Sequence, residues 1–221
     1  MNTFSPSSSL QFGWHTFKKR GWFLVGSTLL MLVIFWMISA IQSAPQDNAG
    51  VGLLIFLATT TASTFASMGL TAFFIRAHDD VMHVSLNELW HPQQFWQFLA
   101  VSILVGIASV IGLILLIIPG LILITMFAFA KLLVIDRAMG PIDAMKESMR
   151  LTKGSRLKLF LLLLALLVIN ILGALTLLIG LLVTIPVSML ALTHAYRSLS
   201  HKGTHHPNTT QLPHAPNTSA I

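Results

Sequence analysis

The residues best suited to chemistry lie in one short polar segment, His-Asp-Asp-Val-Met-His over residues 78–83. Histidine and aspartate are common metal ligands, and histidine is a frequent general base. However, this spacing matches no established ligand motif, and the segment follows a long apolar stretch, where polar side chains are simply solvated. We therefore predict no metal site and no cofactor. The histidines of the tail are assigned to a low-complexity segment rather than to a site: His201, His205, His206 and His214.

Catalytic motifs are absent from the sequence. It contains no serine in a nucleophile elbow, no HExxH pair and no glycine-rich phosphate loop. It also contains no cysteine, which excludes disulfides, thiolate catalysis and thiolate metal sites. We therefore expect a protein that is not an enzyme and has no catalytic residues.

Polar residues within otherwise apolar stretches are a second kind of candidate site. Asn170, Thr125 and the Thr-rich run 59–64 could line a route for a solute, but hydrogen bonding and close packing between helices explain them more simply. Pro186 predicts a kink, and Pro119-Gly120 predicts a tight turn. We keep a structural or pore-lining role open for Pro119, Gly120, Asn170 and Pro186.

Composition decides which elements must position these residues. The chain of 221 residues is 55% apolar and 9% charged, whereas about a quarter of residues are charged in soluble domains. Hydropathy predicts an all-α, polytopic membrane protein with six transmembrane helices arranged as three hairpins. The predicted spans are 22–41, 51–75, 95–118, 121–135, 157–172 and 175–196, within a transmembrane domain over 21–197.

The cations indicate an orientation. If the six spans alternate, all 13 Lys and Arg residues lie on one side of the membrane. The positive-inside rule makes that side the cytoplasm. We predict a multi-pass protein of the cytoplasmic (inner) membrane with both termini in the cytoplasm. The cations flank apolar segments instead of forming a patch on a soluble domain, so nucleic acid is not an expected partner.

Four polar segments accompany the spans. An interfacial helix is predicted within the N-terminal segment 1–20, and a second one over residues 85–90. An amphipathic cytoplasmic helix is predicted over 140–153, with an apolar stripe of Ile142, Met145 and Met149. The residues from 198 to 221 are predicted to be a disordered cytoplasmic tail.

The region from Ile117-Ile118-Pro119-Gly120 to Ser148-Met149-Arg150-Leu151-Thr152-Lys153-Gly154 resembles a known group. It is similar to the uncharacterised YciC-like integral membrane proteins, and through them to the membrane domain of some glycerophosphodiester phosphodiesterases. The resemblance implies a six-helix bacterial inner-membrane protein of unassigned role, without catalytic residues. The residues that carry it are Asp136, Gly140, Pro141, Ser148, Leu151, Thr152, Gly154, Tyr196 and Arg197.

Three functions are open at this point. The first is a membrane scaffold that contacts anionic lipid or a protein partner through Lys146, Arg150, Lys153 and Arg156. The second is a small-solute transporter or channel, which in so short a chain would require a homo-oligomer. The third is a membrane anchor or regulatory subunit of a separately encoded enzyme.

Overall fold

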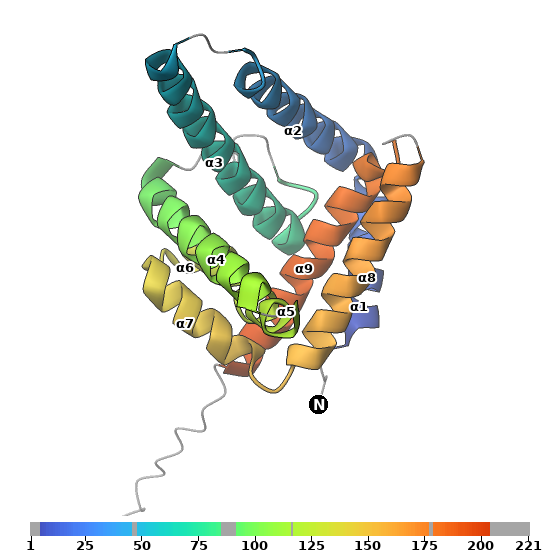
Figure 1. The fold of residues 1–221 in the computed structure, drawn as a ribbon. Helices are drawn as coiled ribbons and strands as arrows, with labels where there is room; N and C mark the ends of the chain where they lie inside the picture. Colours follow the sequence, from blue (N-terminus) through green and yellow to red (C-terminus); the bar gives the residue numbers. More distant parts are fainter. Residues whose placement is uncertain (1–4, 46–47, 85–91, 116, 177–178, 204–221) are drawn as a thin grey trace, which may run out of the picture.

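The computed structural model of this chain describes residues 5–45, 48–84, 92–115, 117–176 and 179–203, and these ranges contain helices but no strand. The helices follow one another as α1 (Pro6–Lys19), α2 (Gly21–Gln42), α3 (Ala49–Asp79), the short 3-10 turn η2 (Pro92–Gln94), α4 (Phe95–Leu115), α5 (Ile117–Met126), α6 (Ala130–Arg137), α7 (Pro141–Thr152), α8 (Arg156–Leu175) and α9 (Leu181–Gly203) (Figure 1).

Helix α9 lies at the centre of the fold. It packs against α1, α2, α3, α7 and α8, so segments from both ends of the sequence meet on it (Figure 1). Tyr196 of α9 is fully buried in the main hydrophobic core, together with Phe98 of α4 and Phe129 at the start of α6. A second cluster joins α2, α3 and the same central helix through Leu24, Phe73 and Leu190.

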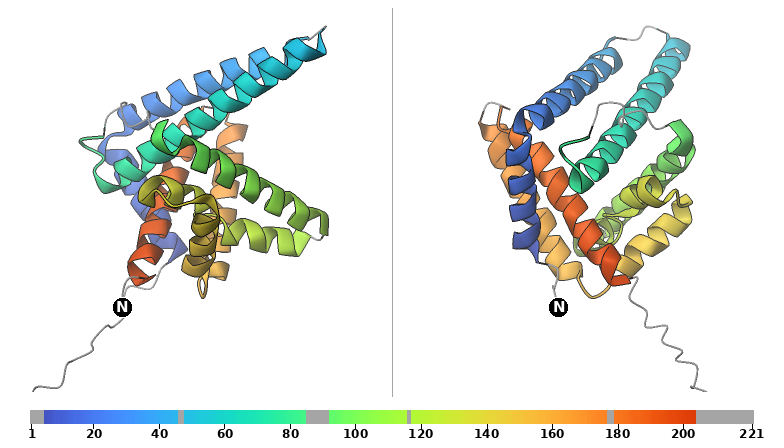
Figure 2. Two further views of the ribbon diagram at one scale, coloured as in Figure 1. Left: turned by 90° about the vertical axis from the view of Figure 1, so that its left-hand side faces the viewer. Right: turned by 180° about the vertical axis from the view of Figure 1, so that it is seen from behind.

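The helices form hairpins, but the hairpins are not parallel. In the left view of Figure 2, the α2–α3 and α4–α5 pairs extend sideways, whereas α8 and α9 run from top to bottom. Glycines allow close approach near two of the turns. A Cβ on Gly120 would lie 2.8 Å from the backbone nitrogen of Leu113, and a Cβ on Gly180 would lie 2.7 Å from the Cα of Gly173.

Four helices are long and apolar enough to cross a membrane: α2, α3, α4 and α8. The candidate spans are Gly21–Gln42, Ala49–Asp79, Phe95–Ile114 and Arg156–Leu175. Helices α5 and α6 have 10 and 8 residues, well below the roughly 20 that a span needs. Helix α9 has 23 residues but carries polar residues along its length, including Thr184, Ser188, Thr193 and His194.

The fourth predicted span, 121–135, is not one continuous helix. The chain leaves the α-helix after Met126, turns through residues 127–129 and re-enters it at Ala130. The predicted turn at Pro119-Gly120 is also displaced, because both residues already belong to α5. The break is tolerated because a side chain of α7 hydrogen-bonds the backbone groups that it leaves unpaired.

Two further boundaries differ from the sequence prediction. Helix α8 continues to Leu175, beyond the turn predicted after residue 172. Helix α9 continues to Gly203, so the first residues of the predicted disordered tail are helical. Leu199 and Ser200 are in fact buried. The rest of the tail and the interfacial helix predicted over 85–90 lie outside the described residues.

Helix α1 packs against α9 along a face of small residues. Pro6 occupies its first turn, and Lys18 and Lys19 complement the helix dipole in its last turn. The buried residues are Ser9, Gly13 and Thr16. A Cβ on Gly13 would lie only 2.6 Å from the carbonyl oxygen of Val187. The N-terminal helix is therefore part of the packed bundle.

Candidate functional site

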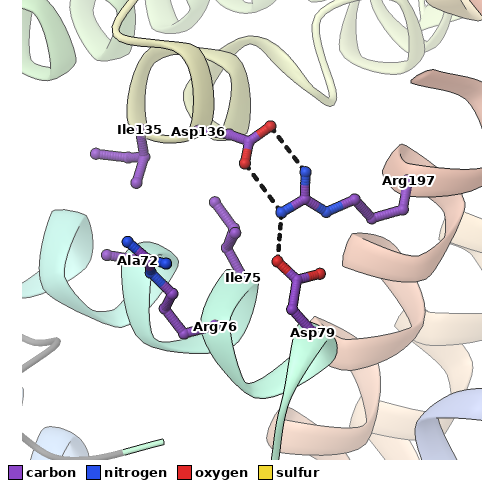
Figure 3. A pocket seen from close by; sticks show the side chains of 7 residues that line it. All are labelled: Ala72, Ile75, Arg76, Asp79, Ile135, Asp136 and Arg197. Atoms are coloured by element: carbon purple, nitrogen blue, oxygen red, sulfur yellow. Dashed lines mark hydrogen bonds and ion pairs between the residues drawn. The ribbon is translucent and has the colours of Figure 1, made fainter. Parts of the chain in front are cut away.

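The densest group of charged side chains joins α3, α6 and α9 through Arg197. Its Nη2 lies 2.6 Å from Oδ2 of Asp79 and 3.0 Å from Oδ1 of Asp136, and its Nη1 donates to Oδ2 of Asp136 over 3.0 Å. Figure 3 shows the guanidinium between the two carboxylates. Tyr196 adds a fourth group, because its hydroxyl donates to Oδ2 of Asp136 over 2.6 Å. We call Arg197, Asp79, Asp136 and Tyr196 the Arg197 cluster.

Burial makes this cluster stronger than an exposed ion pair. The side chains of Asp136 and Arg197 are 15% and 23% exposed, whereas Asp79 is 46% exposed. Partly desolvated charges attract each other more strongly than charges in bulk water. The fork of Arg197 binds Asp136 with two nitrogens, which also fixes the relative orientation of α6 and α9. The cluster is therefore built to lock three helices together.

A cavity of about 140 Å³ adjoins the Arg197 cluster. Arg76 and Asp79 line it from α3, Asp136 from α6 and Arg197 from α9 (Figure 3). With two guanidinium groups and two carboxylates, its lining is close to neutral. The described lining of the cavity contains no serine, cysteine or histidine, and both of its carboxylates are bound to Arg197.

The histidines of the segment 78–83 are directed to different partners. His78 Nδ1 lies 3.0 Å from Oδ1 of Asp79, and its Nε2 lies 3.3 Å from Nδ1 of His194. The ring of Phe12 stacks on His194 with centroids 4.3 Å apart. His83 instead pairs with Asp80 over 2.7 Å at an exposed position. No group of three metal-ligating side chains occurs within the described part of the chain.

Ser148 of α7 bridges the break between α5 and α6. Its hydroxyl donates to the carbonyl oxygen of Met126 over 2.7 Å and accepts from the backbone N–H of Phe129 over 3.2 Å. These two backbone groups lose their helical partners where the helix is interrupted. A buried unpaired backbone group costs about as much free energy as a lost hydrogen bond. Ser148 thus compensates the break.

Helix α7 packs through a face that differs from the predicted apolar stripe. Pro141 in its first turn and Asp143 near its start favour helix initiation. Its buried residues are Ala144, Ser148, Leu151 and Thr152. Of the predicted stripe, Ile142 is 59% exposed, whereas Met145 is partly buried and packs against the main core. Gly140 precedes the helix, and Gly154 follows it with a φ of +82°, which favours glycine.

A surface ion pair lies on α7. Glu147 accepts from Nε and Nη2 of Arg150 over 2.6 and 2.7 Å, and from Arg137 over 3.3 Å. The hydrogen bond from Arg150 lowers the pKa of the Glu147 carboxyl below its ordinary value. Arg150 is therefore already engaged with an acid on its own helix.

The other predicted lipid contacts are freely accessible. Lys146, Lys153 and Arg156 are exposed, and no ion pair is found for them among the described residues. Arg156 is the first residue of α8, a candidate membrane span. The structure thus leaves three of the four predicted cations exposed, one on α7 and two at the junction of α7 and α8.

The predicted pore-lining residues take part in helix packing. Asn170 Nδ2 donates to Ser188 Oγ over 2.8 Å, which links α8 to α9, and its Oδ1 is buried without a partner. Pro186 lies inside the continuous helix α9. Gly120 packs α5 against α4, and Pro119 belongs to the first turn of α5.

The sequence prediction missed two members of these groups. Asp79 was treated as a solvated residue, although it ends α3 one helical turn after Arg76 and binds Arg197, 118 residues further on. Ser200 was placed in the tail, although Arg137 donates to its hydroxyl. The sequence does contain one signal for the cluster. Asp79, Asp136 and Arg197 all fall near the ends of predicted spans on the same side of the membrane, where acidic and basic side chains can pair.

Comparison with known proteins covers part of this region. Residues 108–203 match a family described as "Protein of unknown function (DUF975)". The match includes Asp136, Ser148, Tyr196 and Arg197, but not Asp79. It covers less than half of the chain.

Two mycobacterial relatives are also similar. The uncharacterized protein Rv2560 of Mycobacterium tuberculosis and the uncharacterized protein Mb2590 of Mycobacterium bovis are each 34% identical over 118 residues, which is 53% of this chain and 36% of the relative. The chain thus matches about a third of the length of these relatives. No solved structure matches. These similarities support an uncharacterised family, but they carry neither the YciC-like designation nor a glycerophosphodiester link.

Proposed function

We propose that this protein is a scaffold of the cytoplasmic membrane that crosses the bilayer six times and binds anionic lipid at the junction of α7 and α8. The observation that carries the proposal is the set of exposed cations on α7 and at its junction with α8, namely Lys146, Lys153 and Arg156. The role is one of binding, and it requires no catalytic group.

Two crossings are proposed beyond the four candidate spans. Helix α9 has 23 residues, and at about 1.5 Å per residue this length exceeds a hydrocarbon core of roughly 30 Å. The α5–α6 unit would form the remaining crossing as a broken helix. Interrupted helices occur within membranes where protein groups satisfy the freed backbone, and Ser148 supplies that compensation at the break.

The charge distribution supports the proposed orientation. With six crossings, the segment from Lys131 to Lys158 lies on the same side as the ends of α1 and α9, where Lys18, Lys19 and Arg197 are located. Cytoplasmic loops carry such an excess of cations. Both termini would then lie in the cytoplasm.

A cation near an anionic bilayer surface contributes about 1 kcal/mol to binding. Lys146, Lys153 and Arg156 are exposed and retain this capacity. Arg150 contributes less to lipid binding, because its guanidinium already pairs with the carboxylate of Glu147 at 2.6 Å. The proposed strength of lipid attraction is therefore unequal among the four cations.

Lipid enrichment around the reconstituted protein tests this function. The full chain is placed in vesicles of phosphatidylglycerol and phosphatidylcholine and extracted in polymer-bounded discs, and the ratio of the two lipids is measured. We expect phosphatidylglycerol enrichment that falls at 1 M salt, where the Debye length is about 3 Å, and that decreases in the variant Lys146→Gln/Lys153→Gln/Arg156→Gln. Equal lipid ratios in the discs and the vesicles would contradict the proposal.

Single cysteines test the topology cleanly, because the natural chain has none. Ser43→Cys follows α2, and Lys153→Cys precedes α8. A membrane-impermeant maleimide should label the first in intact cells and the second only after permeabilisation. Labelling of both from outside would refute the proposed orientation.

A further inference from the structure

A groove of about 460 Å³ lies between α5 and α8, away from the Arg197 cluster. These two helices contact each other, and α5 lies beside α8 in Figure 1. We call this feature the α5–α8 groove. Its lining residues are Leu121, Ile122, Thr125, Arg156, Leu157 and Phe160.

The walls of the α5–α8 groove are apolar and accessible. Leu157 is 72% exposed and Ile122 is 46% exposed, although both are large hydrophobic residues. Thr125 is buried, and its hydroxyl donates to the carbonyl oxygen of Leu121 over 2.8 Å. Its hydrogen is thus used within its own helix. The walls therefore suit a hydrocarbon chain.

One end of the α5–α8 groove is cationic. Arg156 is exposed, and it is the only charged residue in the described lining. Lys153 and Lys158 are exposed beside it in the sequence. Arg156 begins a candidate membrane span. With α8 crossing the bilayer as proposed, the guanidinium would lie near the lipid phosphates.

We propose that the α5–α8 groove binds one anionic phospholipid, with an acyl chain between the two helices and the phosphate on Arg156. This inference rests on the proposed lipid-binding function and assigns it a defined site. The complementarity is of two kinds: an apolar wall meets the chain, and a cationic end meets the headgroup. The groove volume falls within the roughly 300–1,000 Å³ typical of small-ligand sites.

The chemistry selects a lipid over other occupants. A soluble anion would use Arg156 but make no contact with the apolar walls at Ile122 and Leu157. An apolar helix from a second copy would cover those residues but bring the guanidinium against hydrocarbon without a counter-charge, which is unfavourable. An anionic lipid satisfies both ends of the groove.

Native mass spectrometry of the full chain tests the site. The protein is released from detergent with defined amounts of phosphatidylglycerol or phosphatidylcholine, and bound lipid is counted. Arg156→Gln removes the headgroup contact, and Ile122→Trp fills the groove. The matched controls are Lys19→Gln, an exposed cation in the last turn of α1, and Leu164→Trp, a residue of α8 that is 43% exposed and outside the groove lining.

We expect one tightly retained phosphatidylglycerol, a loss of about fivefold in Arg156→Gln, a similar loss in Ile122→Trp and little change in either control. Equal losses in Arg156→Gln and Lys19→Gln would overturn the site while leaving diffuse lipid attraction intact. No loss in Ile122→Trp would also overturn it, as would a dimer that this variant dissociates. No preference for phosphatidylglycerol over phosphatidylcholine in the natural chain would refute the proposed function as well.

Discussion

Replacing Arg197 with glutamine should be among the most destabilising polar substitutions in this fold. The change removes the donor shared by Asp79 and Asp136 and leaves two carboxylates facing each other. Breaking a buried ion pair by removing one partner costs about 3–5 kcal/mol. Because Arg197 is 23% exposed, we expect the lower end, about 3 kcal/mol.

The exposure of each side chain predicts how strongly its substitution destabilises the fold within the Arg197 cluster. Asp136→Asn should cost about 2 kcal/mol, since Asp136 is 15% exposed and loses charge-assisted bonds. Asp79→Asn should cost about 1 kcal/mol or less, because Asp79 is 46% exposed and surface pairs contribute little. The matched control is Arg150→Gln, whose pair with Glu147 is equally short at 2.6 Å but whose side chain is 52% exposed.

Thermal unfolding in one detergent at one scan rate measures these differences. At about 2–4 °C per kcal/mol for a chain of this size, Arg197→Gln should lower the Tm by about 6–12 °C. Arg150→Gln should change it by no more than about 4 °C. The reasoning is refuted if these two variants lower the Tm equally, or if Asp79→Asn has a larger effect than Asp136→Asn.

Three further contacts can be probed by substitution in the same assay. Glu147 has a lowered pKa in the fold, so its stabilising effect is complete above the ordinary glutamate pKa of about 4.3 and is lost as the pH falls through the lowered value. Glu147→Gln should therefore reduce the loss of thermal stability on acidification. An unchanged loss would contradict this. Gly13→Ala should destabilise the fold by about 1–3 kcal/mol, because the added Cβ would lie 2.6 Å from the carbonyl oxygen of Val187. A Cβ on Gly26 would have no atom within 4 Å, so Gly26→Ala should stabilise the fold by up to about 1 kcal/mol. Equal effects of the two variants would refute the close packing at Gly13. Asn170→Leu should cost about 0.6–2 kcal/mol, and adding Ser188→Ala should then cost little more, whereas fully additive losses would show that the two side chains are not coupled.

The sequence predicts local elements better than their interruptions. Periodicity and end signals locate α7, because Pro141 marks the start of the helix and Gly154 follows its end. The break after Met126 was not predictable in the same way, since hydropathy reports apolar character and not backbone continuity. What permits the break is the hydroxyl of Ser148, which lies 22 residues further along the chain.

The candidate site shows the same limit. The resemblance named Asp136, Tyr196 and Arg197 as residues of interest, but no spacing rule pairs a residue with one that lies 60 or 61 positions away. Asp79 was missed for the same reason. Long-range ion pairs depend on how hairpins pack, and this information is not carried by the period of any single helix.

The close contact between Gly13 and α9 has a consequence for biosynthesis. The chain is made from its N-terminus, so α1 is complete while the helix that covers Ser9, Gly13 and Thr16 has not yet been translated. Docking of α1 must therefore wait until α9 is in place, and contacts of such high sequence separation form late in folding. Helix α1 is thus synthesised well before α9, yet it docks only after α9 has formed.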